Sequence, residues 1–213
     1  MKVLLSFIFT KALNFMYDVA VLGSGPGGSI AACIFAEAGL SVLLIEEGAS
    51  VEQDKLKPFS LDEMDMKYRA QGVTVAMGNP KINYIEGSVV GGGSEVNSGL
   101  YFAPNEVNIN NWIKEFNIKD FSYSELIKHS SIIERDINVS LMPVEPPLAS
   151  RKLYEGAKRM NWSAIEVPRW IKYKTNSSPG VRQSMSETYI PRFLEAGGQL
   201  TSKTKVTKIK KSK

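Results

Sequence analysis

The feature that most constrains the fold is the order strand, glycine turn, helix, strand between residues 17 and 48. Residues 17–22 are mostly apolar and end at a glycine, as buried parallel strands do. Residues 29–38 are rich in alanine and isoleucine and predict a helix that ends at Gly39. Residues 41–45 predict a second apolar strand. The segment therefore predicts a βαβ unit of an α/β fold.

The turn between the first strand and the helix fits the pattern G-x-G-x-x-G of dinucleotide-binding folds. Gly23 allows a tight turn, Gly25 lets the main chain approach a pyrophosphate, and Gly28 permits close packing of helix and strand. Pro26 and Gly27 complete this turn. Free N–H groups and the positive dipole end at a helix start favour a diphosphate. The turn predicts a dinucleotide site; the alternative is a structural turn in an unrelated α/β fold.

An acid at the end of the second strand supports the dinucleotide interpretation. The carboxylate of Glu46 can accept hydrogen bonds from a ribose diol, and it would repel a 2′-phosphate, which disfavours NADP. Glu47 is the competing acid. Because neighbouring strand residues face opposite ways, we expect only one of the two to point at the ribose, and we favour Glu46.

A second glycine cluster lies in residues 86–104, with Gly91, Gly92 and Gly93 in a row. Consecutive glycines cannot fill a core with side chains, and they usually mark main chain pressed against a ligand or another segment. No lysine follows in the form G-K-[ST], which excludes a nucleoside triphosphate loop. Taken alone, the cluster is more often a flexible loop than a binding site.

Together the two glycine motifs resemble the glucose–methanol–choline (GMC) oxidoreductase family, which is FAD-dependent. In that family a segment V-G-G-G-S-x-x-N-x-G runs beside the flavin, with amides near the pyrophosphate and the asparagine near the isoalloxazine ring. The resemblance implies that both glycine segments converge on one bound FAD. The cofactor-lining residues that it implies in the second segment are Val90, Gly91, Gly92, Gly93, Ser94, Asn97 and Gly99.

The resemblance continues towards the end of the chain. Residues 183–191 are similar to a segment of the long-chain alcohol oxidase and cholesterol oxidase-like branch. Residues 196–209 resemble a strand that returns to the flavin domain, and Val206 is implied to contact the adenine end. The alternation in residues 205–209 predicts a strand with a frayed end. The chain departs from that branch in lacking an arginine after the signature and in having Glu95 at a position that is commonly small or apolar.

Alcohol oxidation moves a hydride to the flavin while a positioned base takes the hydroxyl proton. In the family the catalytic histidine and its partner lie in the C-terminal part. The single histidine here, His129, comes before any such region, and we interpret it as a solvated helix residue. We therefore predict no catalytic residue in this chain. It is expected to be a truncated or split FAD-binding portion of an oxidoreductase acting on CH–OH groups, incomplete for catalysis alone, whose C-terminal half is separately encoded or lost.

Two alternatives remain open at the level of the sequence. One is a self-contained NAD-dependent dehydrogenase, and the other is a non-catalytic dinucleotide-binding module. The predicted partners are FAD and, if a C-terminal half completes the site, a small-molecule alcohol. We predict no metal site, because no cluster of histidine, cysteine and acids has ligand spacing.

We predict an α/β chain with a Rossmann-like FAD-binding βαβ core, the beginning of an interleaved substrate subdomain, and no C-terminal part of the family fold. The expected divisions are an N-terminal extension (1–16), the first part of the FAD-binding domain (17–135), the start of the substrate-side subdomain (136–197) and a returning strand (198–213).

Several local features carry further expectations. By resemblance, residues 50–85 form a loop or lid over the flavin. Ser124 can cap a helix, and residues 151–160 are spaced for an amphipathic one. Trp162 and Trp170 are expected in the core.

The charge distribution, the single cysteine and the N-terminal residues narrow the expected partners and cellular location of the protein. The formal net charge of +4 comes from residues 203–213, which carry six lysines and no acid, so we predict no nucleic-acid partner. The only cysteine, Cys33, excludes an internal disulfide and is expected in the core. The apolar start of residues 1–15 is interrupted by Lys11 and is too short to span a bilayer. We expect a docked helix there and a cytoplasmic protein; the alternative is a membrane-surface anchor.

Overall fold

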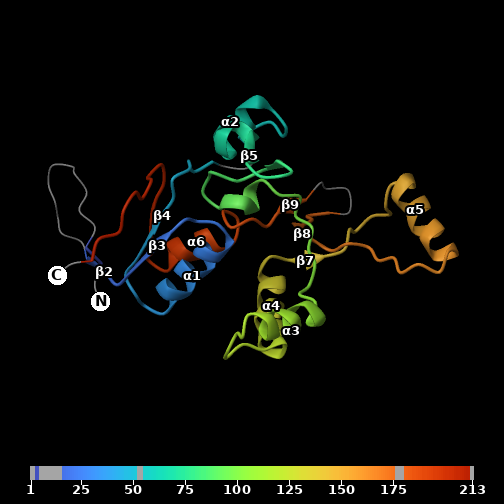
Figure 1. Cartoon of the computed structure of the whole chain (residues 1–213). Helices are drawn as coiled ribbons and strands as arrows, with labels where there is room; N and C mark the ends of the chain where they lie inside the picture. Colours follow the sequence, from blue (N-terminus) through green and yellow to red (C-terminus); the bar gives the residue numbers. More distant parts are fainter. Residues whose placement is uncertain (1–2, 5–15, 52–54, 176–179, 212–213) are drawn as a thin grey trace. The chain divides into compact units, whose positions relative to one another are not determined.

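The computed structural model of the chain describes residues 3–4, 16–51, 55–175 and 180–211 (Figure 1). These residues form two compact units. The first unit combines Met1–Asn97 with Ser184–Lys213, and the second is Ser98–Gln183. The predicted domain boundary after residue 135 therefore lies inside the second unit, and the one after residue 197 lies inside the first.

The first unit is built on a three-stranded parallel sheet. Its strands are β3 (Val19–Leu22), β4 (Val42–Ile45) and β10 (Gln199–Thr201), and their order is β10-β4-β3. All four residues of the central strand β4 are buried, as expected for a strand with a neighbour on each side. The predicted βαβ unit is confirmed, because helix α1 (Pro26–Glu37) connects the parallel strands β3 and β4.

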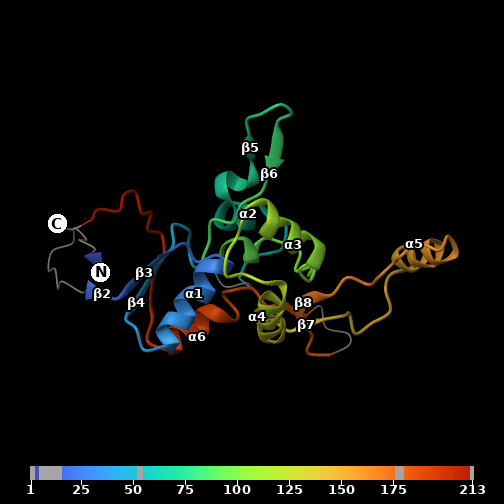
Figure 2. The same ribbon diagram turned by 60° about the horizontal axis from the view of Figure 1, so that its bottom comes forward.

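Helix α1 begins three residues earlier than predicted, because Pro26 occupies its first turn, where a missing N–H costs nothing. Its small residues face inward, and Cys33 is fully buried, as predicted. Gly39 follows the helix with φ +84°, the left-handed conformation that ends helices. Helix α6 (Tyr189–Glu195) packs against α1, and the two lie side by side in both views (Figures 1 and 2).

The segment expected as a loop or lid has secondary structure of its own. It contains helix α2 (Leu61–Lys67), the 3₁₀ turn η1 (Arg69–Gly72) and an antiparallel hairpin of β5 (Thr74–Ala76) and β6 (Ile82–Tyr84), which Figure 2 shows beyond α2. Ser60 caps α2 by accepting a hydrogen bond from the Glu63 N–H. The segment is therefore more regular than a simple loop, and its place over a flavin stays a prediction.

The second glycine cluster forms the 3₁₀ turn η2 (Gly92–Glu95). At the start of the chain, β1 (Val3–Leu4) pairs with β2 (Met16–Tyr17) in antiparallel fashion. Most of the predicted N-terminal helix falls outside the described residues. In the described part of the chain, no helix combines the length and apolar character needed to cross a membrane.

The predicted strand at residues 205–209 is wrong. The strand that joins the sheet is β10, which ends at Thr201. Lys203 takes a left-handed φ of +51°, and its N–H donates to the Gly48 carbonyl, while the Thr204 N–H donates to the Glu46 carbonyl. These bonds turn the main chain across the end of β4, so the alternating residues that follow do not extend the sheet.

The second unit combines three helices with a small antiparallel sheet. The helices are α3 (Glu106–Glu115), α4 (Tyr123–Asp136) and α5 (Leu148–Arg159), and the strands, in the order β7-β8-β9, are β7 (Val139–Ser140), β8 (Arg169–Lys172) and β9 (Val181–Arg182).

Several expectations concern residues of this second unit. The predicted amphipathic helix is α5, displaced by a few residues. The cap of α4 is Ser122, which accepts from the Glu125 N–H, so the prediction for Ser124 is wrong by one half-turn. Trp170 is buried as predicted, and its Nε1–H donates to the Leu100 carbonyl (3.2 Å). Trp162 is 61% exposed, which overturns its assignment to the core.

Candidate cofactor-binding site

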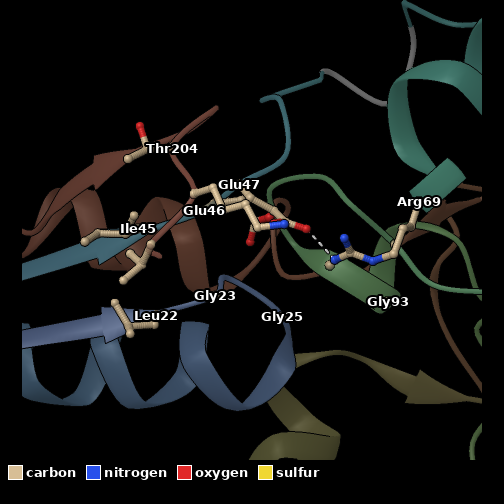
Figure 3. A pocket seen from close by; sticks show the side chains of 13 residues that line it. Leu22, Gly23, Gly25, Ile45, Glu46, Glu47, Arg69, Gly93 and Thr204 are labelled. Atoms are coloured by element: carbon tan, nitrogen blue, oxygen red, sulfur yellow. Dashed lines mark ion pairs between the residues drawn. The ribbon is translucent and has the colours of Figure 1, made fainter. Parts of the chain in front are cut away.

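A cavity of about 430 Å³ lies in the first unit, where strands β3 and β4 end at their carboxyl edge (Figure 3). This is the edge at which open parallel sheets bind ligands. The volume falls in the range of small-molecule sites. The residues that line the cavity are Leu22, Gly23, Gly25, Ile45, Glu46, Glu47, Arg69, Gly87, Gly92, Gly93, Thr204, Lys205 and Val206.

The cavity brings together predicted residues from four separate segments. Those that line it are Gly23, Gly25, Glu46, Gly92, Gly93 and Val206. Pro26, Gly27 and Gly28 form the first turn of α1. Val90, Gly91 and Ser94 are buried in the second glycine segment. Asn97 does not line the cavity, and Gly99 belongs to the second unit.

The two glycine turns pack against each other through main chain alone. A Cβ atom on Gly92 would lie 2.7 Å from the Cα of Gly25, closer than any side chain tolerates, and Gly92 has φ +55°. The expectation that the two glycine segments share one cleft is confirmed. A Cβ atom on Gly28 would overlap the Gly23 carbonyl oxygen, which confirms the close packing predicted for the third glycine.

Buried hydrogen bonds link the first glycine turn to the second. The Ser24 hydroxyl donates to Glu46 Oε2 (2.7 Å) and accepts from the Gly91 N–H (3.1 Å). The Ser94 hydroxyl donates to the Gly91 carbonyl (2.7 Å) and accepts from the Met185 N–H (3.0 Å). Both serines are almost fully buried. Ser24 therefore connects the end of β4, through Glu46, with the second glycine segment, through Gly91.

Replacing Ser24 with alanine is expected to destabilise the protein by about 1–3 kcal/mol, because the buried Gly91 N–H loses its acceptor. Urea unfolding followed by far-UV circular dichroism measures the change. The same replacement at Ser131, an exposed residue of α4, is the control and should change stability by no more than about 0.5 kcal/mol. Equal effects of the two substitutions would show that the Ser24 bonds do not stabilise the fold.

The carboxylate of Glu46 is held by main-chain and hydroxyl donors. Its Oε2 accepts from the Ser24 N–H (2.8 Å) and hydroxyl, and its Oε1 accepts from the Gly48 N–H (2.9 Å). A carboxylate can accept about four hydrogen bonds, so these three leave capacity for about one more donor. Because Glu46 is only 6% exposed, bulk solvent has little access to its carboxylate, and the remaining acceptor position is left to a ligand in the cavity.

Glu47 also lines the cavity, but its partners are cations (Figure 3). It forms ion pairs with Arg69 and with Lys205 (3.4 Å), and the hydrogen bond from Arg69 lowers the pKa of its carboxyl below the ordinary value. Arg69 also pairs with Glu86 (2.5 Å). Both acids thus border the cavity, and they differ in their partners. Which of the two points at a ribose stays a prediction.

These features fit a dinucleotide. Gly25 is the N-cap of helix α1 and has no side chain to cap it, so the first N–H groups and the dipole of the helix are offered to a ligand. The glycine residues present main chain alone, and the buried Glu46 carboxylate can accept from a sugar hydroxyl. Arg69 adds a cation to the cavity wall, and sequence reasoning missed it because it comes from η1, far from either glycine motif.

The remaining observations concern His129, Tyr101 and side chains that could bind a metal ion. His129 is exposed on α4, as predicted for a solvated helix residue. Tyr101, which stands near the position of the family's arginine, donates its hydroxyl hydrogen to Glu134, and burial together with this bond raises its pKa. Among the described residues, no group of three or more histidine, cysteine and acidic side chains is arranged to hold a metal ion.

Comparison with known proteins identifies the family. Residues 27–213 match the family model described as GMC oxidoreductase. An uncharacterised GMC-type oxidoreductase of Sinorhizobium fredii is 30% identical over 211 residues, which cover 96% of this chain and 42% of that protein. A long-chain-alcohol oxidase of Arabidopsis thaliana is 28% identical over 159 residues, covering 74% of this chain and 21% of that protein. The chain thus spans less than half the length of these relatives.

Solved structures show the same fold. An FAD-dependent oxidoreductase from Chaetomium thermophilum has a TM-score of 0.65 at 16% identity, covering 87% of this chain and 38% of the other. A formate oxidase of Aspergillus oryzae, studied for FAD modification, has a TM-score of 0.58 at 14% identity, covering 88% of this chain and 38% of the other. The chain therefore has the fold of these two proteins. This chain belongs to the GMC oxidoreductase family.

Proposed function

We propose that this chain is the FAD-binding part of an oxidoreductase that acts on CH–OH groups of donors. The observation that carries the proposal is the cavity in which Gly25 and Gly92 meet through bare main chain beside the buried carboxylate of Glu46. The name of the Arabidopsis relative, a long-chain-alcohol oxidase, supports an alcohol as the class of donor.

Each predicted residue has a proposed role towards FAD. The N–H groups at the start of α1, around Gly25, Gly27 and Gly28, hold the diphosphate together with the second glycine segment. Glu46 accepts a hydrogen bond from the ribose, and Val206 borders the adenine. Asn97 and Gly99 are proposed to lie near the reactive ring. FAD, when bound, supplies the hydride acceptor.

The proton acceptor for alcohol oxidation is proposed to come from outside this chain. Four ionisable side chains among the described residues line the cavity, namely Glu46, Glu47, Arg69 and Lys205. Glu46 is held by three donors and Glu47 by two cations, so neither carboxylate is arranged as a general base. These residues are therefore proposed to bind the cofactor without turning over alcohol on their own.

Ligand titrations test this proposal. The cavity is assigned to the adenosine diphosphate half of FAD, so FAD and ADP should bind to the purified chain while FMN, which lacks that half, should not. Isothermal titration calorimetry measures all three. If ADP and FAD both fail to bind at millimolar concentration, the proposal is wrong. Production of NADH from NAD and an alcohol without flavin would instead favour a self-contained dehydrogenase.

Replacing Glu46 with glutamine is expected to weaken ADP binding by about 10- to 150-fold, the equivalent of about 1.5–3 kcal/mol for a hydrogen bond to a charged group. The reason is that the ribose loses its anionic acceptor. Glu47→Gln is the matched control: its carboxylate faces Arg69 and Lys205, so ADP affinity should fall less than about fivefold. A larger loss in the Glu47 variant would transfer the ribose role to that acid.

A further inference from the structure

Glu95 is a buried acid to which the proposed function gives no role. It is the last residue of the 3₁₀ turn η2, is 2% exposed and does not line the cavity. Burying a carboxylate is costly unless it accepts hydrogen bonds. The same turn contains Gly92 and Gly93, which do line the cavity. The contacts of the Glu95 side chain therefore indicate what this acid does for the site.

The side chain of Glu95 folds back over the start of its own turn. A Cβ atom on Gly91 would overlap Glu95 Oε1 and would lie 2.9 Å from Glu95 Cγ and Cδ. Gly91 also has φ +96°, a conformation that glycine adopts without steric cost. The carboxyl group therefore fills the space that a side chain at position 91 would take, and it packs directly against the main chain there.

The carboxylate of Glu95 is held from the segment in which the chain returns to the first unit at Ser184. Glu95 Oε1 accepts from the Ser186 hydroxyl (2.8 Å) and from the Ser186 N–H (3.3 Å). Because the Ser186 hydroxyl gives its hydrogen to Glu95, it must accept in its contact with the Ser184 hydroxyl (3.1 Å). Two hydroxyls thus donate in series towards one carboxylate, and each bond in such a chain strengthens the next.

Gly91 is the residue through which these contacts reach the cavity. Its N–H donates to the Ser24 hydroxyl (3.1 Å) in the first glycine turn. The next residue, Gly92, packs against Gly25 of that turn. Glycine has the freest main chain of all residues, so its conformation depends strongly on its neighbours. A side chain that restrains Gly91 therefore also restrains the place of Gly92.

We propose that Glu95 is a positioning residue for the cofactor, which holds the second glycine turn against the first through its bonds to Ser186 and its contact with Gly91. It acts through the main chain of the turn and touches no ligand itself. This inference rests on the proposed function, because that function assigns a diphosphate to the turn. Binding of the diphosphate part of a ligand, and not of its nucleoside part, should therefore depend on Glu95 and Ser186.

Glu95→Ala tests this dependence with two ligands. ADP should bind to the complete chain at least about tenfold more weakly, as expected when about one hydrogen bond to the diphosphate is lost. Adenosine, which lacks the diphosphate, should change in affinity by less than about threefold. Ligand-observed NMR titration measures both, because it detects millimolar binding. An unchanged affinity for ADP, or an equal loss for ADP and adenosine, would overturn the proposal.

Conservative and paired substitutions identify the bond that matters. In Glu95→Gln the amide oxygen can accept the same two bonds, so ADP affinity should stay within about threefold of the original. Ser186→Ala should weaken ADP binding, and adding it to Glu95→Ala should cause no further loss, because both changes break the same interaction. Losses that multiply in the double variant would show that the two residues act separately, contrary to the proposal.

A substitution elsewhere in the first unit separates position from stability. Ile190→Val shortens a buried side chain of α6 that does not line the cavity. It should lower the unfolding temperature without changing ADP affinity, measured where circular dichroism shows every variant folded. If Ile190→Val loses as much ADP affinity as Glu95→Ala, affinity simply follows stability and the proposal is wrong.

Hydrogen exchange of the ligand-free chain gives a readout that does not involve the cofactor. The Gly91 amide should exchange at least about tenfold faster in Glu95→Ala, whereas the Gly23 amide, which donates to the Ile45 carbonyl (2.8 Å), should change by less than about threefold. Unchanged exchange at Gly91 would overturn the role of Glu95. Faster exchange at Gly91 in a chain that binds neither ADP nor FAD would instead contradict the cofactor proposal alone, so the two failures are distinguishable.

Discussion

Gly28→Ala is expected to destabilise the first unit by about 3 kcal/mol, near the upper end of overpacking effects. The added Cβ would overlap the carbonyl oxygen of Gly23 and lie 3.4 Å from Val21 Cγ1. Because the obstacle is main chain, no change of rotamer relieves it, and the start of α1 must move away from β3. Thermal unfolding should show a midpoint lowered by roughly 6–12 °C for a chain of this size.

Gly27→Ala is the matched control for this prediction. Gly27 lies one residue earlier in the same helical turn, and a Cβ there has no atom within 4 Å. Alanine is favoured over glycine inside helices by about 1 kcal/mol, so this variant should be as stable as the original chain or slightly more stable. If the two variants unfold at the same temperature, contact between α1 and the glycine turn is not what requires glycine at position 28.

Gly92→Ala is expected to abolish tight binding of ADP and FAD, with a loss of at least about 100-fold. A Cβ at Gly92 would lie 2.7 Å from Gly25 Cα, and the residue has φ +55°, which alanine adopts only at a cost of about 1–2 kcal/mol. The two glycine turns would separate, and two main-chain hydrogen bonds to a diphosphate at about 1.5–3 kcal/mol each would be lost. Calorimetric titration with ADP measures the change.

The control for the second glycine segment is Gly93→Ala. Gly93 is exposed, and a Cβ on it would have no atom within 4 Å. The free energy of unfolding of the Gly93→Ala variant, measured in urea, should stay within about 0.5 kcal/mol of that of the original chain. The Gly92→Ala variant should lose about 2–5 kcal/mol of unfolding free energy, because the close contact and the backbone strain add up. A Gly92 variant that keeps its ADP affinity would show that the two turns need not touch for binding.

The βαβ core could be predicted from the sequence because its signals are local. The apolar strands, the glycine turn and the alanine-rich helix can each be recognised from residues that are close together in the sequence. The same holds for the end of α1 at Gly39. The meeting of the two glycine segments was also predicted, but through resemblance to a family, since no local pattern connects Gly25 with Gly92. The structure supplies the physical reason, which is contact between two stretches without side chains.

The features that escaped prediction depend on contacts distant in sequence. Arg69 reaches the cavity because Glu47 and Glu86 hold its guanidinium, and no spacing rule links these three residues. Alternation predicted a strand around Val206, but hydrogen bonds to the end of β4 turn the main chain away before it. Trp162 is exposed although tryptophan is usually well buried, because burial depends on what surrounds a side chain.

The Ser94 hydroxyl has a consequence for how this architecture can vary. The chain leaves the first unit after Asn97 and returns at Ser184, and the bond from the Met185 N–H to Ser94 ties these crossing points together. When the two ends of an inserted segment are held side by side, the segment can become longer or shorter or be replaced at a small entropic cost to the rest of the protein. The second unit can therefore diversify in evolution while the two glycine turns of the first unit keep their arrangement.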